Sequence, residues 1–175
     1  MINIIKSKDK IYPRLQTDGD NTQFAAPYAK QICVGSGLDI GYSEDLNRKW
    51  ALPNSIPFNI CCDDNDAYNL PYEDMSLSYI YSSHCLAYLP NWVEALDHWT
   101  SKLKSNIIQR HGTLFLYLPR YSRESLKRWD GNKRVHYFTG DEIVDYLETN
   151  GRYTSIFKSG PDLNNSIMII AQKEV

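Results

Sequence analysis

The sequence predicts an α/β protein: a mostly parallel β-sheet packed between helices in three layers, with an antiparallel final strand. Short apolar runs alternate along the chain with amphipathic stretches of helical spacing, and this alternation is typical of strands joined by crossover helices. The last two apolar runs have no helical stretch between them, so we expect them to pair antiparallel and to place an antiparallel strand at the sheet edge. The 175 residues, 42% of them apolar, are enough for one substantial core.

Length and composition favour a single domain over residues 1–175. Residues 1–21 are polar and rich in turn formers, so we expect them to form an irregular N-terminal arm. Asn21 or Thr22 is then placed to cap a helix that ends near Gln31.

Three apolar segments predict the strands of the first half. The run over residues 32–40 is interrupted by glycines, so only its second half is expected to form a short buried strand. Further strands are expected over residues 55–62 and 77–83, the latter with large side chains alternating with smaller ones.

The second half predicts two helices and three further strands. Asn91 precedes a helix that runs to about Lys104 and has one apolar face. Thr139 and Glu142 have capping-box spacing at the start of a helix over residues 141–149. The strands are expected over residues 113–118, 153–158 and 166–172.

Composition excludes several classes of function. The net charge of −2 gives no global reason to expect nucleic acid or an anionic membrane as partner. The first apolar run is too short for a signal peptide, and no run approaches the roughly 20 residues of a membrane helix. The four cysteines form no Cys-x-x-Cys pair, so we expect reduced thiols rather than a metal or disulfide site. These features predict a soluble, cytoplasmic protein.

Residues 37–41, Gly-Leu-Asp-Ile-Gly, predict an apolar strand that ends in a glycine turn. In a doubly wound sheet the ligand lies outside the carboxyl ends of the strands, so the loop after this strand is the expected binding place. Asp39 would order the loop through bonds to backbone amides, and Gly41 would let the backbone pass close to a ligand. Alone, the pattern also fits an ordinary strand exit.

Residues 66–80 supply a second motif: an Asp-Ala pair, a Leu-Pro turn, an acidic loop and then a strand. In this order and spacing the two motifs resemble the cofactor pocket of the class I S-adenosylmethionine-dependent methyltransferases, of the methyltransferase type 11 kind. The similarity extends over roughly residues 36–173. It implies a three-layer Rossmann-like methyltransferase sheet, with S-adenosylmethionine as cofactor and S-adenosylhomocysteine as product.

The resemblance also implies which residues contact the cofactor. Asp66 would accept a hydrogen bond from the adenine amino group, and the Ala67 amide would donate to an adenine ring nitrogen. Asn59 stands where the family carries an acidic residue that binds the ribose hydroxyls, with Asn54 as the alternative if the strand register differs. The other expected contacts lie at strand exits: Asp39, Ile40, Gly41, Tyr42, Ser43, Ile60, Ser83 and His84.

The chain departs from the family pattern in two ways. Ser43 and Asp45 stand where turn glycines are usual, and a non-glycine residue at positive φ is disfavoured. Only residues 60–65 separate Asn59 from Asp66, whereas a parallel crossover needs about a dozen residues or more. We therefore expect the helix between the second and third strands to be missing and the third strand to be vestigial or absent. The thinly covered flank would suit a partner chain, such as a second copy in a homo-oligomer.

Methyl transfer from a sulfonium requires mainly alignment and exclusion of water, with a base only where the acceptor is protonated. His84, at a strand exit, is the first candidate base and His136 the second; for each the alternative is a structural or surface histidine. Ala87 and Tyr88 stand where family members often carry an acidic residue and a histidine, which removes one usual source of acid–base chemistry.

Residues 120–136 are basic and aromatic, with six Lys or Arg residues against two acidic ones. This connection leaves the carboxyl end of a central strand, so it can cover the substrate side. Arg120, Tyr121 and Trp129 are the expected substrate contacts, since arginines with aromatic rings suit a phosphate-bearing or sugar-like molecule. A solvated amphipathic helix over residues 122–129 is the alternative.

The leading interpretation is methyl transfer from S-adenosylmethionine to a small-molecule substrate, such as a sugar or a nucleotide-linked metabolite. The second is a degenerate methyltransferase-like module that binds the cofactor, its product or a protein partner without catalysis; the lost glycines, Asn59 and the Ala87–Tyr88 pair favour it. Methylation of RNA or DNA is third, because the chain is mildly acidic and carries no Asn-Pro-Pro-Tyr-type base-flipping motif.

Overall fold

The computed structural model describes residues 4–7, 10–13, 25–41, 52, 55–60, 66–105, 112–121, 134–162 and 165–173. The expected helix cap at Asn21 or Thr22 lies outside the described residues. Several other residues that the sequence singles out also lie outside them: Tyr42, Ser43, Asp45, Asn54, Cys61, Cys62 and Trp129.

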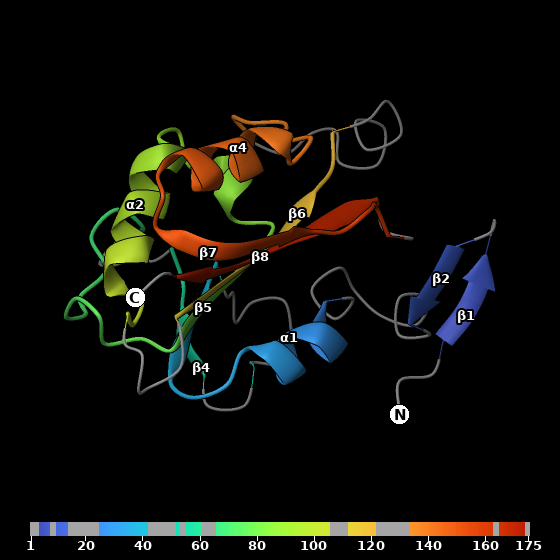
Figure 1. Ribbon diagram of the computed structural model, residues 1–175. Helices are drawn as coiled ribbons and strands as arrows, with labels where there is room; N and C mark the ends of the chain where they lie inside the picture. Colours follow the sequence, from blue (N-terminus) through green and yellow to red (C-terminus); the bar gives the residue numbers. More distant parts are fainter. Residues whose placement is uncertain are drawn as a thin grey trace.

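Six strands form one central sheet in the order β4-β3-β5-β6-β8-β7 (Figure 1). Their bounds are Gly37–Ile40 for β3, Ser55–Phe58 for β4, Tyr79–Ser83 for β5, Thr113–Pro119 for β6, Tyr153–Lys158 for β7 and Ser166–Lys173 for β8. Strands β4, β3, β5 and β6 run parallel, whereas β8 is antiparallel to both of its neighbours. The mostly parallel sheet with an antiparallel final strand is therefore confirmed.

The expectation that the antiparallel strand lies at the sheet edge is wrong. β8 lies between β6 and β7, and β7 forms the edge. The first four residues of β8 are buried on both faces of the sheet, whereas most of β7 after Tyr153 is exposed. The inner position goes to the more apolar strand, because only there are both faces covered.

The opposite edge of the sheet is β4 in the described part of the chain, and Ile56 and Pro57 of this strand are exposed. Residues 66–78, which lead into β5, form turns and one isolated bridge at Leu77 but no helix. The prediction that the helix between the second and third strands is missing is thus confirmed for the described residues. Among them, no further parallel strand lies beside β4.

Helices cover both faces of the sheet: α1 (Ala26–Ile32) lies on one face, and α2 (Trp92–Lys102) and α4 (Asp141–Thr149) lie on the other (Figure 1). A short 3₁₀ helix, η3 (Leu86–Tyr88), links β5 to α2. The predicted three layers are present. In the described part of the chain, no helix is long and apolar enough to cross a bilayer.

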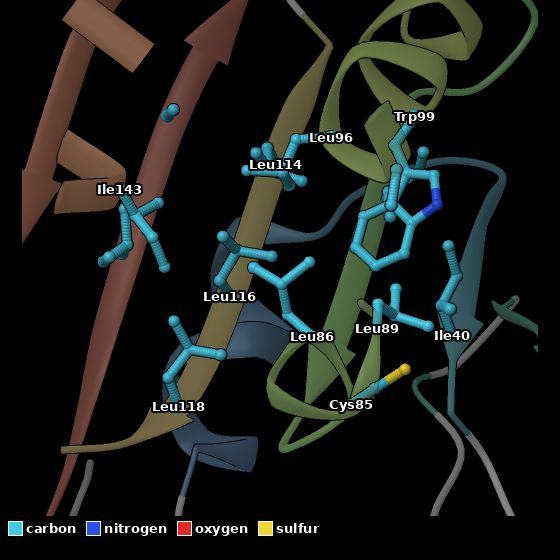
Figure 2. Packing of buried hydrophobic residues seen from close by; sticks show 14 of the residues in the cluster. Ile40, Cys85, Leu86, Leu89, Leu96, Trp99, Leu114, Leu116, Leu118 and Ile143 are labelled. Carbon is cyan, nitrogen blue, oxygen red and sulfur yellow. The ribbon is translucent and has the colours of Figure 1, made fainter. Parts of the chain in front are cut away.

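Strand alternation sends successive side chains to opposite faces, which produces two different cores. On the α2–α4 face, aliphatic side chains and Trp99 interlock (Figure 2). The α1 face is richer in aromatic side chains: Tyr79, Tyr81, Phe115 and Tyr117 pack there with Ala25, Ala29 and Cys33. Cys33 and Cys85 are both buried.

The start of α4 uses the predicted capping-box pair in a modified form. The Glu142 carboxylate accepts hydrogen bonds from the backbone amides of Thr139 at 2.9 Å and Gly140 at 3.1 Å. Gly140, with a φ of 97°, is the residue before the helix. The Thr139 hydroxyl bonds the Glu142 carboxylate at 2.5 Å, so the glutamate supplies most of the cap.

The N-terminal arm is not irregular where it is described. β1 (Ile4–Ser7) pairs antiparallel with β2 (Lys10–Pro13), and together they form a separate two-stranded sheet (Figure 1). Ser7 pairs with Lys10, so two residues separate the strands, which is the commonest length for a hairpin connection. The apolar pairs at positions 4–5 and 11–12 were the sequence signal for these strands.

Candidate functional site

The carboxyl ends of three parallel strands bring predicted cofactor residues to one edge of the sheet. The Gly41 amide donates to the Phe58 carbonyl at 2.9 Å, so Gly41 and Asn59 lie side by side beyond β3 and β4. Ile40 pairs with Ser82 in the neighbouring strand, which places Ser83 at the same edge. Since Asn54 precedes β4, Asn59 is the asparagine at the carboxyl end of this strand.

Gly41 is required at this edge by both conformation and space. Its φ is +89°, which L side chains rarely adopt, and a Cβ atom there would lie 2.6 Å from the Cβ of Cys85. Position 41 therefore carries no side chain, and Cys85 fills the space where one would lie.

Two polar side chains lie buried at the strand ends, on the α1 face. Asp39 is 6% exposed. Burial raises the pKa of the nearby Cys33 thiol, and the negative charge of Asp39 raises it further. Ser83 is 8% exposed, and its hydroxyl has no hydrogen-bond partner among the described residues. A buried hydroxyl without a partner is costly, so Ser83 marks a place where a polar ligand group would be stabilising.

The Asp66–Ala67 pair forms a tight turn against α2. One carboxylate oxygen of Asp66 accepts the Tyr68 amide at 2.8 Å. The Ala67 carbonyl accepts the indole N–H of Trp99 at 2.8 Å. Asp66 is exposed, and an ionised carboxylate has about four acceptor positions, so this residue retains capacity to bind a donor from a ligand.

His84 follows β5 in an unusual backbone conformation, with a φ of 56°. Its amide donates to the Tyr117 carbonyl at 2.7 Å, and its ring stacks on the Tyr117 ring with centroids 5.0 Å apart. The ring Nε2 lies 3.0 Å from the Ser166 hydroxyl. A non-glycine residue at positive φ stores strain and is a recurrent feature of functional sites.

Asp162 connects the partners of His84 into one network. Its carboxylate accepts the Tyr117 phenol at 2.6 Å and the Ser166 amide at 3.0 Å. The negative charge of Asp162 adds to the effect of burial in raising the pKa of Tyr28, a residue of α1. The network thus reaches from β5 across β6 to the start of β8 and lies near α1.

His136 lies in a different setting. Its Nε2 is 2.8 Å from the Pro90 carbonyl, and since a carbonyl oxygen only accepts, this nitrogen donates. The backbone amides of Val135 and His136 both bond to the Ala87 carbonyl, at 3.0 and 3.1 Å. The two candidate bases therefore have different partners: His84 contacts β6 and β8, and His136 contacts the η3–α2 junction.

Aromatic and basic side chains gather where the chain leaves β6 and returns toward α4. Tyr121 and Tyr137 are 47% and 50% exposed, and their rings meet edge to face with centroids 5.9 Å apart. The Tyr121 amide donates to the Phe138 carbonyl at 2.6 Å. Nearby, the Arg134 guanidinium lies 5.9 Å from the centre of the Tyr88 ring. This aromatic surface includes Tyr121, one of the predicted substrate contacts.

Comparison with known proteins gives structural matches only. No protein-family model matches the sequence, and no curated protein sequence does. A Haloferax volcanii protein described as a candidate methyltransferase, solved in complex with the methyltransferase activator Trm112, matches with a TM-score of 0.61 at 12% identity over 86% of this chain and 89% of that one. A Thermotoga maritima protein, described as an S-adenosylmethionine-dependent methyltransferase and a candidate histamine N-methyltransferase, matches with a TM-score of 0.60 at 16% identity, covering 87% and 91% of the chains. A Bacillus halodurans protein described as a candidate methyltransferase matches with a TM-score of 0.59 at 11% identity, covering 86% of this chain and 99% of that one. This chain has the class I methyltransferase fold.

Within this methyltransferase fold, sequence reasoning missed three residues of the polar network: Tyr117, Asp162 and Ser166. Tyr117 lies in an apolar strand and was indistinguishable from a core residue. Asp162 lies in a Gly-Pro-Asp stretch, which is typical of an ordinary turn. The sequence signal was the position of Asp162 and Ser166 near the start of β8. This strand begins beside the carboxyl end of β6, where Ser166 pairs with Pro119.

Proposed function

We propose that this protein binds S-adenosylmethionine at the shared carboxyl edge of β3, β4 and β5 and transfers its methyl group to a small-molecule acceptor. The observation that carries the proposal is the convergence of Gly41, Asn59 and Ser83 at that edge. The methyltransferase fold supports the same place, since ligands of doubly wound sheets lie beyond the carboxyl ends of the strands.

The residues at this edge fit the cofactor. The side-chain oxygen of Asn59 would accept a hydrogen bond from a ribose hydroxyl, although without the added strength of a charged acceptor. The Asp66 carboxylate would accept the adenine amino group, and the Ala67 amide would donate to the adenine ring. The Ser83 hydroxyl, which has no hydrogen-bond partner among the described residues, would bond a polar group at the methionine end.

When bound, the cofactor supplies an electrophilic methyl group for in-line displacement. The chain has to align the acceptor and, where the acceptor is a hydroxyl or ammonium group, to take up a proton. His84 is the base in this proposal, because Ser166 and the Tyr117 ring fix the orientation of its imidazole. When the ring takes up a proton, both ring nitrogens carry hydrogen, and the Nε2–H would donate to the Ser166 hydroxyl oxygen, which can accept it.

Arg120, Tyr121 and Trp129 would contact the acceptor in this proposal. The exposed Tyr121–Tyr137 pair offers flat apolar rings beside the substrate side, and such rings stack on sugars and nucleobases. Arg120 follows β6 directly and would bind a phosphate group. These features favour a sugar or a nucleotide-linked metabolite.

A second candidate function is cofactor or partner binding without catalysis. At the position where related methyltransferases often carry acid–base residues, the Ala87 carbonyl instead holds the backbone of residues 135 and 136. The exposed edge strand β4 would suit a partner chain. The Haloferax volcanii protein of similar fold was solved in complex with an activator protein, and this supports a partner-binding role.

Calorimetric titration with S-adenosylmethionine and S-adenosylhomocysteine tests the cofactor site. We expect binding of both by the wild-type protein and its loss in Asp66→Ala, with Asp145→Asn, an exposed residue of α4, as the matched control. No binding of either compound at about millimolar concentration would overturn the proposal. Binding without turnover on a panel of sugar and nucleotide-linked acceptors would favour the second function.

A further inference from the structure

Residues 66–78, called the α2-bound loop below, are bonded to α2 along its length. At one end, Trp99 donates its indole N–H to the Ala67 carbonyl at 2.8 Å. The backbone amide of Asn91 donates to the Tyr68 hydroxyl at 3.1 Å. These bonds hold the proposed adenine turn against the residue before α2 and against Trp99 within the helix.

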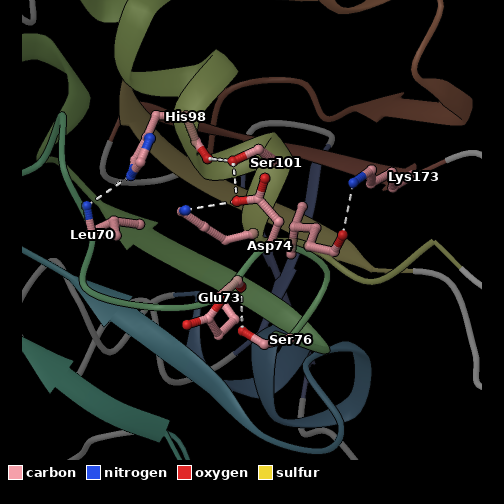
Figure 3. Close-up of polar contacts among 9 residues, drawn as sticks. Leu70, Glu73, Asp74, Ser76, His98, Ser101 and Lys173 are labelled. Carbon is pink, nitrogen blue, oxygen red and sulfur yellow. Dashed lines mark hydrogen bonds and ion pairs between the residues drawn. The ribbon is translucent and has the colours of Figure 1, made fainter.

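The other end of the α2-bound loop is held by an ion pair. Lys102 Nζ lies 2.7 Å from the Asp74 carboxylate, and the Ser101 hydroxyl donates to the same oxygen at 3.2 Å (Figure 3). The hydrogen bond from Lys102 is the main cause that lowers the pKa of Asp74. At mildly acidic pH the Asp74 carboxylate therefore stays ionised, and this end of the loop stays bound to α2.

Between these two ends, the imidazole of His98 holds the loop at Leu70. The Leu70 amide donates to Nε2 at 2.7 Å (Figure 3). Since an amide N–H only donates, Nε2 must be unprotonated, and the neutral ring carries its proton on Nδ1. Protonation of the ring would set one N–H against another, so the bond would be lost.

The surroundings of His98 favour its neutral form. Burial lowers the pKa of His98, and Lys102 on the same helix lowers it further, whereas Asp74 and Asp66 on the facing loop act in the opposite direction. Because the folded pKa lies below the ordinary value of 6.5, the unfolded chain binds more protons at acidic pH. The stabilisation by the neutral ring is full above pH 6.5 and is lost as the pH falls below it.

We propose that His98 is a positioning residue for the cofactor: its neutral imidazole holds the adenine turn against α2, and protonation releases that turn. The inference rests on the proposed function, since it takes the Asp66–Ala67 turn as the adenine site. Leu70 lies three residues beyond Ala67, so freeing its amide loosens the turn next to the adenine clamp while the Asp74 end stays bound. Cofactor affinity should then fall in step with the titration of His98.

The test measures S-adenosylhomocysteine affinity by calorimetry at about pH 7.5 and about pH 5.5 in four proteins. The wild type should lose about tenfold in affinity at the lower pH, the order of magnitude expected for one broken hydrogen bond. His98→Gln keeps an acceptor for Leu70 that does not titrate, so its affinity should change little with pH. His98→Leu should bind weakly at both pH values, because it offers no acceptor to the Leu70 amide. Ser101→Ala removes a different contact of the same loop, the hydrogen bond to Asp74, and should keep the wild-type pH dependence.

A second readout is independent of the cofactor. In nuclear magnetic resonance spectra of the free protein, the Leu70 amide signal should titrate together with the His98 ring in the wild type and be unaffected by pH in His98→Gln. Equal loss of affinity at low pH in the wild type and in His98→Gln would overturn the role of His98. A wild type that does not bind S-adenosylhomocysteine at about pH 7.5 would instead overturn the proposed function, whatever the Leu70 signal does.

Discussion

Gly41 packs so closely against Cys85 that a Cβ atom at position 41 would lie 2.6 Å from the Cβ of Cys85. Gly41 follows β3 and Cys85 precedes η3, so this contact joins the exits of two neighbouring parallel strands. The φ of Gly41 is +89°, a conformation that itself disfavours a side chain. Sterics and conformation together make the exit of β3 intolerant of substitution.

We expect Gly41→Ala to destabilise the protein by about 2–4 kcal/mol, which combines the cost of a left-handed alanine with that of overpacking. Urea unfolding measures the loss. Gly151→Ala is the matched control: Gly151 also has a positive φ, of +64°, but a Cβ atom there would meet nothing within 4 Å. Its loss should be about 1–2 kcal/mol, and equal losses at the two sites would contradict the role of Cys85.

The indole of Trp99 is expected to hold the Asp66–Ala67 turn from within the core. Trp99 is fully buried, and its N–H is bonded to the Ala67 carbonyl. Trp99→Phe leaves that carbonyl without its donor, which should cost about 1–3 kcal/mol in addition to the smaller ring. Trp92→Phe is the control, because Trp92 is only partly buried and packs through ring edges on Phe138 and Tyr146. A smaller loss in Trp99→Phe than in Trp92→Phe, by urea unfolding, would contradict the prediction.

Much of the fold could be predicted from the sequence because strand burial and helix periodicity are local properties. β5 and β6 are buried at every position, and such short apolar runs between helical stretches identify parallel strands. The relative positions of β7 and β8 could not be predicted, since that choice depends on which strand is better covered once both faces are packed. The hairpin of β1 and β2 was missed because polar residues around its short apolar pairs outweighed them.

The candidate site divides in the same way. Gly41, Asn59 and Ser83 lie at the carboxyl ends of recognisable strands, so their shared edge could be predicted once the strands were known. The Asp162 network depends on contacts across 45 residues to Tyr117 and on the approach of His84 to Ser166 across 82 residues. No local pattern encodes such contacts, because they arise from strand order. The bond between His98 and Leu70, across 28 residues, belongs to the same kind.

Alkaline stability should depend on the buried phenol of Tyr153. Burial raises the pKa of Tyr153 above its ordinary value of 10.0, and the neutral group bonds the Thr100 hydroxyl at 2.7 Å. Its stabilisation is therefore full below pH 10.0 and is lost as the pH rises beyond it, because the unfolded chain releases the proton first. Tyr153→Phe should be less stable at neutral pH by about 1 kcal/mol.

The comparison of the two proteins across pH provides the check. The difference in stability between wild type and Tyr153→Phe should shrink above about pH 10, as measured by urea unfolding. Tyr79, whose pKa burial raises to about 12, remains in both proteins, so some alkaline loss should persist in the variant. A difference that is constant with pH would show that Tyr153 does not titrate on unfolding.

The proposed base is tested by His84→Asn, because asparagine tolerates the left-handed backbone that His84 adopts at a φ of 56°. With a hydroxyl or ammonium acceptor, kcat should fall by about 100-fold or more, while S-adenosylhomocysteine affinity changes by less than about twofold. Ser82→Ala is the matched control, since Ser82 lies in β5 two residues before His84 and its hydroxyl has no partner among the described residues. Because asparagine suits the backbone conformation at position 84, an unchanged kcat would exclude His84 as the base. The contact between His84 and Ser166 would then be a structural one.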